Sequence, residues 1–370
     1  MSVLNRINIG VVGVCGGVGR GGQMVHVLNS VPPVSVHALC DIDREGLAKA
    51  NEKMGVEETY CDYGEMLEKS DLDAVFIATP MALHVPQSVA ALRKGLHVLC
   101  EVTAATDIQQ CRELVAACKA SKAVYMMAEN YNYHRHVAVV REMVLRGLFG
   151  TPYYAEGGYV ADCKGLAELT RWRRKWQVGV NGIPYITHNL GTMLQWMPGE
   201  RVLSVCCSGC GHHYRDQRGE AYEAEDSCTM LGKTTSGGQV VVRSDFLSNR
   251  PGMGVYNDLQ GTDGCYESPR HQGECHRIWL ASKKPKPEWM NLSEIDEEFL
   301  PEYWKKAIAD GSGFWCDHFQ VMDFVDAILG KAPNPLGIHE TMDLTLPGLI
   351  SQLSIAEGGR WMHVPDSREW

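Results

Sequence analysis

The sequence of 370 residues contains no apolar run long enough to cross a lipid bilayer. Its longest apolar stretches, such as residues 74–78 and 124–128, have the length of a β-strand. The first six residues lack the apolar core of a signal peptide, so we expect no secretory signal. Basic residues are not in excess either, because the net charge is −10 and is spread along the chain. These absences argue against a membrane protein and against nonspecific binding to nucleic acid or anionic membrane.

Repeats and low-complexity segments are also absent, and hydrophobic residues make up 45% of the chain, enough for a packed core. The length predicts two domains, since a domain usually has about 100–200 residues. The 14 cysteines could form disulfides, but several of them, such as Cys40, Cys100 and Cys118, lie within apolar runs. In a chain of this size we interpret them as reduced thiols of the core, and we expect a cytoplasmic protein.

The first half of the chain alternates short apolar runs with helix-like segments. We predict strands at residues 7–14, 34–40, 74–78, 97–100 and 124–128. We predict helices at residues 20–28, 44–54, 86–94 and 108–121. Strands separated by helices form βαβ units, in which the strands are parallel. The fold class is therefore α/β, with residues 1–128 predicted to form a Rossmann domain around a doubly wound parallel sheet.

The second half has longer strand candidates with alternating apolar and polar residues. They lie at residues 152–159, 202–207, 227–231, 238–246 and 276–281. Helical patterns accompany them at residues 136–146 and 319–329. Alternation is typical of sheets with one exposed face. We predict a second α/β domain over residues 129–370, built on a large, open, mixed or antiparallel sheet.

A glycine-rich loop at residues 13–22 follows the first predicted strand and opens the first predicted helix. Glycines permit a tight turn and the close approach of a pyrophosphate to N–H groups at a helix N-terminus. Gly17, Gly19 and Gly22 match the dinucleotide fingerprint, and Gly13 and Gly16 offer an alternative register. We predict a nucleotide cofactor here, with contacts from Gly13, Gly16, Gly17, Gly19 and Arg20.

Asp41 stands at the tip of the second predicted strand, about 20 residues beyond the loop, where the fingerprint requires an acid. Its carboxylate can accept both ribose hydroxyls and would repel a 2′-phosphate, which favours NAD as the cofactor. Arg44 lies close by in the sequence and keeps NADP open as an alternative. A loop that serves only as a turn in a Rossmann-like fold is the other alternative.

Short motifs stand at the ends of the later strands of the first half. They are Ala78-Thr79-Pro80, His84, Ala91-Leu92-x-x-Gly95-Leu96-His97-Val98 and Cys100-Glu101-Val102-Thr103. With these motifs the chain resembles the Gfo/Idh/MocA oxidoreductase family. The resemblance implies NAD contacts from Thr79, Pro80, His84, Glu101 and Asn130, and Glu101 stands where ligands bind in doubly wound sheets.

Position 102 departs from the sugar dehydrogenases of that family. Their segment at Glu101 reads Glu-Lys-Pro, and the lysine serves as proton donor or relay. In this chain Val102 takes the place of the lysine. Because valine cannot move a proton, plain alcohol dehydrogenation has lost its usual acid–base group.

Further motifs continue over nearly the whole chain. They are Glu129-Asn130-Tyr131-Asn132-Tyr133, Gly157-Gly158-Tyr159, Trp172-Arg173, Asn181-Gly182, Thr187-His188-x-x-Gly191, Gln260-Gly261-Thr262-x-Gly264 and Ile355-Ala356-Glu357-Gly358-Gly359. In their order and spacing they resemble the NAD-dependent glycoside hydrolase branch of the family. Its α-N-acetylgalactosaminidases are the nearest resemblance, and a sulfoquinovosidase is a further candidate.

The resemblance implies a redox-assisted cleavage of a hexoside. In that branch the sugar is transiently oxidised at C3, a tyrosine removes the acidified C2 proton, the aglycone is eliminated, water adds, and C3 is reduced again. Tyr133 matches the base tyrosine, and His188 matches a histidine near the C3 hydroxyl. The alternative for Tyr133 is a half-buried packing residue, and for His188 a capping or packing residue.

The substrate region differs from the α-N-acetylgalactosaminidases. Their Arg-Pro-Tyr is Arg250-Pro251-Gly252 here, and the segment at residues 171–176 is unusually basic. Arginine forks suit anions and tryptophans stack on sugar faces, so an anionic hexoside such as a sulfoquinovoside or a uronide is a candidate substrate. The implied substrate contacts are Arg171, Trp172, Arg173, Arg174 and Lys164. A solvated basic face is the alternative.

Cysteines and histidines at residues 207–213 raise the alternative of a metal site. Cys207-x-x-Cys210 followed by His212-His213 has the spacing of a zinc knuckle, but no second Cys-x-x-Cys follows, so we predict no metal. Asp317 precedes a predicted helix and either caps it or reaches the site. The alternative functions are an NAD(P)-dependent sugar or inositol dehydrogenase and a catalytically silent NAD-binding regulator. We further expect a homo-oligomer that acts on a small-molecule glycoside.

Overall fold

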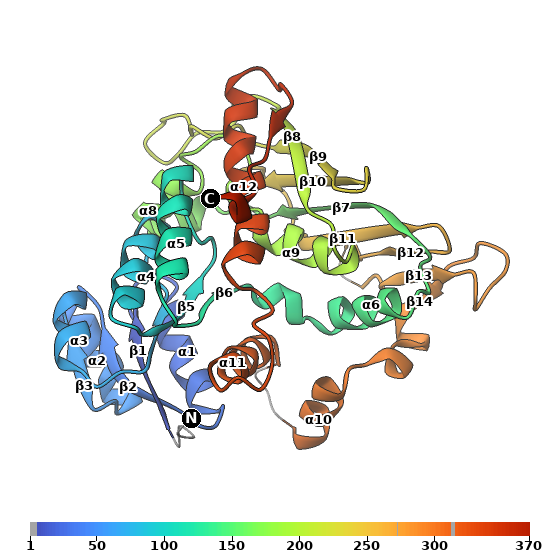
Figure 1. The fold of residues 1–370 in the computed structure, drawn as a ribbon. Helices are drawn as coiled ribbons and strands as arrows, with labels where there is room; N and C mark the ends of the chain where they lie inside the picture. The colour runs from blue at the N-terminus through green and yellow to red at the C-terminus, as the bar shows by residue number, and fades with distance from the viewer. Residues whose placement is uncertain (1–5, 272, 312–314) are drawn as a thin grey trace. The chain divides into compact units, whose positions relative to one another are not determined.

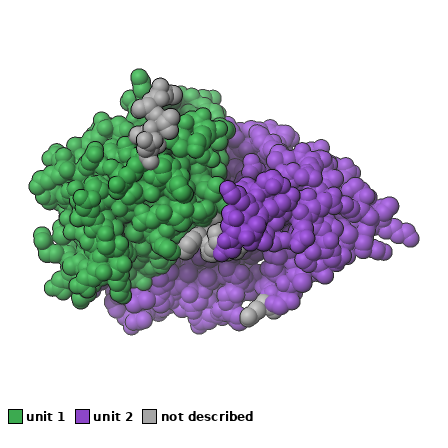
Figure 2. Space-filling view, turned by 90° about the horizontal axis from the view of Figure 1, so that it is seen from below, with its two compact units in different colours: residues 1–129, 317–342, 366–370 green, residues 130–316, 343–365 purple. Residues whose placement is uncertain are grey.

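A computed structural model describes residues 6–271, 273–311 and 315–370 (Figure 1). Residues 1–5, on which most of the signal-peptide expectation rests, lie outside this part. Contacts divide the chain into two compact units (Figure 2). Unit 1 contains residues 1–129, 317–342 and 366–370, and unit 2 contains residues 130–316 and 343–365. Among the described residues, no helix combines the length and the apolar character that crossing a membrane requires.

The compact units differ from the expected division into residues 1–128 and 129–370. The first boundary agrees to within one residue, but two carboxy-terminal segments join unit 1. Contacts within the unit explain this: the main-chain N–H of Met127 donates to the Leu336 carbonyl (3.3 Å), and Asn334 Nδ2 donates to the Tyr125 carbonyl (2.7 Å). Pairings between segments so far apart in the sequence leave no local pattern.

Unit 1 is built on a six-stranded sheet in the order β3-β2-β1-β4-β5-β6, and all of its strands are parallel. The strands are β1 (Ile7–Val12), β2 (Val34–Cys40), β3 (Glu58–Tyr60), β4 (Ala74–Ile77), β5 (His97–Glu101) and β6 (Tyr125–Ala128). The order reverses beside β1, so right-handed crossovers put the connecting helices on both faces. The predicted doubly wound Rossmann sheet is confirmed. The short strand β3 was not predicted, because three residues are too few for a periodic pattern.

The helices of unit 1 include α1 (Arg20–Asn29), α2 (Arg44–Met54), α3 (Tyr63–Lys69), η1 (Met81–Leu83), α4 (His84–Arg93), α5 (Ile108–Ala120) and η5 (Ser367–Glu369). Several of them begin at an aspartate that caps the first turn. The side chains of Asp43, Asp62 and Asp107 accept hydrogen bonds from N–H groups in the first turns of α2, α3 and α5. Helix α1 begins instead after Gly19, which has no side chain to fill this position.

Unit 2 is built on a nine-stranded sheet in the order β14-β13-β12-β11-β7-β10-β9-β8-β15. The strands are β7 (Pro152–Val160), β8 (Val202–Gly209), β9 (Cys228–Thr234), β10 (Gln239–Asp245), β11 (Gly254–Gly261), β12 (Gly264–Glu267), β13 (Arg277–Leu280), β14 (Met290–Asn291) and β15 (Met362–His363). Strands β7 and β10 are parallel, and the remaining pairs are antiparallel. The predicted large mixed sheet is confirmed.

Helix α9 (Thr187–Trp196) lies directly on this sheet. A Cβ on Gly157 would lie 2.3 Å from the Tyr256 carbonyl and 2.9 Å from Met193 Cε, so only glycine allows the close approach of helix and strand. Asn189 Nδ2 then donates to the Tyr256 carbonyl (3.0 Å) and to Asn257 Oδ1 (2.9 Å).

The remaining helices of the described chain are η2 (Asn130–Tyr133), α6 (Arg135–Leu145), α7 (Lys164–Leu169), α8 (Arg171–Trp176), η3 (Leu292–Glu294), η4 (Asp296–Phe299), α10 (Glu302–Asp310), α11 (Trp315–Ile328) and α12 (Ile338–Ala356).

Candidate active site

The loop between β1 and α1 has the geometry of a phosphate cradle. Gly13, Gly16 and Gly19 adopt φ values of +84°, +97° and +59°, which disfavour other residues. A Cβ on Gly13 would lie 2.6 Å from the Ala78 carbonyl, whereas no atom lies within 4 Å of a Cβ on Gly16. The first glycine closes the turn against the sheet, and the second faces open space. Gly17 is exposed beside them, so the alternative register of the fingerprint describes the turn best.

The surroundings of the loop fit a dinucleotide. Helix α1 presents its first N–H groups beside Gly19 without a capping side chain, as anion-binding helices do. Asp41 Oδ2 accepts from the main-chain N–H of Cys15 (2.7 Å), and Oδ1 accepts from that of Asp43 (2.9 Å). Burial, together with the negative charges of Asp41 and Asp43, raises the pKa of Cys15 to about 11. This negative environment suits ribose hydroxyls better than a 2′-phosphate.

Arg20 opens α1, but its guanidinium pairs with two carboxylates of unit 1. Nε donates to Glu101 Oε1 (2.6 Å), and Nη1 and Nη2 donate to the two oxygens of Asp317 (2.8 and 2.7 Å). Burial disfavours the charged form, yet the two carboxylates outweigh it and raise the pKa of Arg20. The Arg20 side chain is thus part of an ion-pair network with Glu101 and Asp317, and its contact with the cofactor stays a prediction.

The Asp317 carboxylate should stabilise unit 1 measurably. We expect Asp317→Asn to lower the free energy of unfolding by about 1–3 kcal/mol, because it removes a bidentate charge-assisted pair that is only 23% exposed on either side. The matched control is Asp326→Asn on the same helix, whose Lys331 partner lies 3.9 Å away at the surface. Urea unfolding of both variants tests this, and equal losses would contradict the assignment.

His84 contacts the main chain just beyond the carboxyl ends of two strands of the sheet. Its ring is 1% exposed, with Nδ1 2.7 Å from the Thr103 carbonyl and Nε2 2.8 Å from the Thr79 carbonyl. Burial lowers the pKa of His84. Thr79 Oγ1 in turn donates to Gln87 Oε1 (2.6 Å), and Pro80 follows as the residue before η1. His84 therefore positions the carboxyl ends of β4 and β5, where doubly wound sheets bind ligands.

In unit 2, His188 lies in a cluster of tyrosine rings. It is the second residue of α9 and is 7% exposed. Its ring lies against that of Tyr131, tilted by 33° with centroids 4.2 Å apart; Tyr185 meets it edge-on at 5.2 Å, and Tyr159 lies at 6.0 Å. The motifs predicted His188 as a site residue but not its contacts with Tyr131 and Tyr185, although Tyr131 lies within the Glu129–Tyr133 motif and Tyr185 stands two residues before the Thr187-His188 motif.

Tyr133 ends the short helix η2, which packs against α9. The Tyr133 carbonyl accepts a hydrogen bond from Trp304 Nε1 (3.2 Å), and the Asn132 carbonyl accepts one from Gln195 Nε2 (3.4 Å). Asn130 begins the same helix. The structure thus brings the two predicted catalytic residues onto neighbouring, mutually packed elements of unit 2.

The predicted basic substrate segment divides into residues with different surroundings. Arg174 forms ion pairs with Glu223 and Asp216, and its Nη2 donates to the Ala221 carbonyl (3.0 Å). Lys164 Nζ donates to the Leu247 carbonyl (2.6 Å) and also contacts Asn249 and Asp162. Arg171 is exposed. The charges of Arg174 and Lys164 are therefore already compensated within the protein.

Arg173 has a different environment. Its guanidinium lies over the Trp172 ring at 4.1 Å, and Nη1 donates to Thr170 Oγ1 (3.1 Å). Burial lowers the pKa of Arg173. The nearby Tyr185 and Tyr159 raise this pKa through their electrostatic interaction, but by less than burial lowers it. In the described part of the chain, no carboxylate pairs with Arg173. A half-buried cation therefore stands beside the same two tyrosines that flank His188.

Two histidines of unit 2, His136 and His276, should make this unit less stable at acidic pH. His136 stacks on His276 at 4.4 Å, His134 lies 5.7 Å from His136, and Tyr266 Oη lies 2.6 Å from His276 Nδ1. Burial lowers the pKa of both His136 and His276, and neighbouring histidine charges lower them further. The unfolded chain, with histidine pKa values of about 6.5, binds these protons first as the pH falls.

The free energy of unfolding should therefore be unaffected by these two histidines above about pH 6.5, and it should decrease as the pH falls toward their folded-state pKa values. The midpoint of urea unfolding should fall between about pH 7.5 and about pH 5.5 in the wild type. We expect a smaller fall in His136→Phe, which keeps a ring in the stack but cannot bind a proton. His363→Phe replaces an exposed histidine and should leave that loss unchanged. An equal loss in wild type and His136→Phe would contradict this origin of the acid sensitivity.

Comparison with known proteins divides the chain near residue 130, where the first boundary between the units also lies. Residues 7–129 match the family described as "Oxidoreductase family, NAD-binding Rossmann fold", and residues 133–369 match "Glycosyl hydrolase 109, C-terminal domain". The second match covers more than half of the chain. The chain belongs to glycosyl hydrolase family 109. The predicted Gfo/Idh/MocA relationship, the glycosidase class and the NAD-binding domain are thereby confirmed.

Individual relatives agree with this family. A glycosyl hydrolase family 109 protein of Saccharopolyspora erythraea is 27% identical over 97% of this chain and 83% of its own length. A protein of Tannerella forsythia, 26% identical over 95% of this chain and 86% of its own, is named alpha-N-acetylgalactosaminidase. Levoglucosan dehydrogenase in complex with NADH and levoglucosan has the same fold, with a TM-score of 0.80, 19% identity, and coverage of 97% of this chain and 100% of its own.

Proposed function

We propose that this family 109 enzyme cleaves a hexoside through transient oxidation at C3, and that the sugar carries an anionic group. The observation that carries the first part is the buried Val102, which replaces the lysine of the family's sugar dehydrogenases. A chain that binds NAD without that lysine needs another acid–base group. Tyr133 and His188, on the mutually packed η2 and α9, are the residues that we assign to this task.

The proposed steps use these two side chains in turn. Reversible uptake of the C3 hydride is the chemistry that NAD supplies when bound. His188 holds the C3 hydroxyl and accepts its proton. Tyr133 then removes the C2 proton, which the C3 ketone has made acidic, and the C1–O bond to the aglycone breaks as the C1–C2 double bond forms. Water then adds its oxygen to C1 and Tyr133 returns the proton to C2, while the remaining proton of the water balances the one that the released aglycone oxygen takes up. As C3 is reduced again, His188 returns its proton to the C3 oxygen.

Arg173 supports an anionic substrate. The Arg173 guanidinium is half-buried and has no carboxylate partner in the described residues. It can therefore bind a sulfonate or carboxylate by donating parallel N–H hydrogen bonds. Trp172, whose ring lies 4.1 Å from this guanidinium, offers a face for the sugar. A sulfoquinovoside or a uronide has the required charge. Arg174 and Lys164 contribute to the same region through their structural contacts rather than as free cations.

The test is a panel of neutral and anionic aryl glycosides, measured for aglycone release and for NADH absorbance together. The proposed enzyme releases aglycone without net NADH, because each cycle regenerates NAD, and it prefers the anionic members. Net NADH formation without aglycone would instead show a dehydrogenase. Neither signal with any glycoside of the panel would contradict the proposed glycosidase.

An NAD(P)-dependent sugar or inositol dehydrogenase is the second candidate, because a levoglucosan dehydrogenase shares the fold over nearly the whole chain. In that case His188 or Tyr133 would replace the missing lysine in alcohol oxidation. The cytoplasmic location and the homo-oligomeric state expected above stay predictions.

A further inference from the structure

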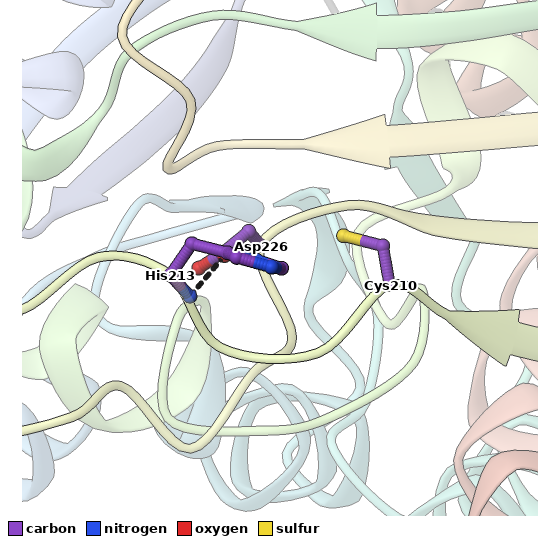
Figure 3. A group of neighbouring side chains, drawn as sticks. All are labelled: Cys210, His213 and Asp226. Atoms are coloured by element: carbon purple, nitrogen blue, oxygen red, sulfur yellow. Dashed lines mark hydrogen bonds and ion pairs between the residues drawn. The ribbon is translucent and has the colours of Figure 1, made fainter.

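The loop between β8 and β9 gathers three potential metal ligands in unit 2 that the proposed glycosidase reaction does not use. Cys210 follows the last residue of β8, His213 comes three residues later, and Asp226 lies shortly before β9 (Figure 3). One atom from each side chain, a sulfur, a ring nitrogen and a carboxylate oxygen, lies within 4.8 Å of the other two.

Main-chain hydrogen bonds hold the two ends of this loop together. The N–H of Cys210 donates to the Ser227 carbonyl (3.1 Å), and the N–H of Asp226 donates to the Gly211 carbonyl (3.0 Å). The ligand side chains therefore meet because the backbone continues the pairing of β8 with β9 beyond the ends of the strands. Their arrangement is a property of the fold rather than of an isolated surface loop.

Asp226 provides an independent indication that the cluster binds a cation. Its side chain is 3% exposed, and Oδ2 is held by the His213 main-chain N–H and by His213 Nδ1 at 2.8 Å. Oδ1 is buried as well, but it has no hydrogen-bond donor among the described residues. Leaving a carboxylate oxygen buried without a partner is costly, and such groups in native proteins usually contact an ion or a water molecule.

We propose that Cys210, His213 and Asp226 bind a transition-metal ion of the zinc class. Thiolate, imidazole and carboxylate together suit Zn²⁺ or Co²⁺ and do not suit Mg²⁺ or Ca²⁺, which prefer oxygen ligands alone. We assign Oδ1 of Asp226 to the ion, since it is the oxygen that has no hydrogen-bond donor among the described residues. Cys210 and His213 are exposed, so the fourth position of a tetrahedral ion is open to solvent.

The distances are compatible with such an ion. Bonds of about 2.0–2.3 Å in a tetrahedral site place neighbouring ligand atoms roughly 3.4–3.8 Å apart. The observed limit of 4.8 Å therefore requires the ligands to close by about 1 Å. Rotation of the two exposed side chains, Cys210 and His213, can provide this movement while Asp226 stays in place.

Such an ion would clamp the loop at residues 211–225. This loop carries Asp216, Ala221 and Glu223, which together hold the Arg174 side chain on α8. The site thus binds the two ends of the segment that anchors the helix containing Arg173. The absence of a second Cys-x-x-Cys led to the prediction of no metal, whereas the third ligand is a carboxylate from the far end of the loop.

The experiment titrates the full-length chain with Co²⁺ after dialysis against EDTA. We expect one ion per chain and a thiolate-to-cobalt charge-transfer band that Zn²⁺ abolishes by displacement. Cys210→Ser should eliminate the band, and Asp226→Asn should weaken Co²⁺ binding by about 10- to 100-fold. The control is Cys275→Ser, which removes another exposed cysteine of unit 2 and should keep both band and affinity.

Folding is monitored for each variant by circular dichroism, and limited proteolysis follows cleavage within residues 211–225 with and without Zn²⁺. Slower cleavage with Zn²⁺ in wild type, absent in Cys210→Ser, supports the clamp. Absence of a charge-transfer band in folded wild type would overturn the site. A band that Cys275→Ser also removes, or that Cys210→Ser leaves intact, would overturn the assignment of the ligands.

Discussion

Replacing Tyr133 with phenylalanine is expected to lower kcat/KM for an aryl glycoside by about 10²–10⁴-fold, the usual contribution of a positioned general base. The substitution keeps the ring at the end of η2, whose main chain is held by Trp304 and Gln195, and removes only the hydroxyl group. The fold should therefore persist while proton transfer at C2 is lost.

Isotope exchange separates this role from packing. In the wild-type enzyme, deuterium at substrate C2 should exchange with solvent, and Tyr133→Phe should abolish the exchange. Tyr153→Phe is the matched control, because it removes the hydroxyl of an exposed tyrosine on β7 and should leave turnover and exchange unchanged. Near-normal turnover of Tyr133→Phe would make Tyr133 a packing residue and would contradict the proposed mechanism.

Replacing Arg173 with alanine is expected to lower kcat/KM by about 10- to 150-fold on an anionic aryl hexoside and to leave its neutral parent nearly unaffected. The estimate corresponds to one charge-assisted hydrogen bond of about 1.5–3 kcal/mol. Arg173 is chosen from the basic segment because no carboxylate of the described residues compensates it, and because it stands beside Tyr159 and Tyr185.

Two neighbours on α8 are the controls for this prediction. Arg171→Ala removes an exposed charge and should change neither substrate's rate. Arg174→Ala breaks the contacts to Asp216 and Glu223, so it should lower stability and affect both substrates alike. Equal losses on both substrates with Arg173→Ala would mean that Arg173 supports the fold, and loss on neither would place it on a solvated face.

Local patterns were sufficient to predict the Rossmann sheet and its cofactor loop. A strand, a glycine turn and a helix N-terminus are all encoded within residues 7–29, and Asp41 follows at the next strand end. Strands β3, β11, β12, β14 and β15 were not predicted. Strands β3, β14 and β15 have only two or three residues, too few for an alternating pattern to be recognised, and β11 begins and ends at glycines.

The candidate site was predicted only in part. His188 and Tyr133 were named through their motifs, but the choice among Arg171, Arg173 and Arg174 could not be made from adjacent letters in the sequence. It depends on Asp216 and Glu223, which lie in a different loop and compensate one arginine and not the next. The partners of a charged side chain determine its chemistry, and they are rarely its sequence neighbours.

The sequence by itself determined the α/β class, the NAD-binding loop and the family, because backbone preferences and motifs are local properties of the chain. Only the tertiary structure decided that Arg20 pairs with Asp317, 297 residues away, and that Cys210, His213 and Asp226 lie together. Such contacts arise when strands and helices pack side by side, which brings distant segments within hydrogen-bond range. The tertiary structure therefore determines whether a polar side chain is bound to other groups of the protein or remains available to a ligand.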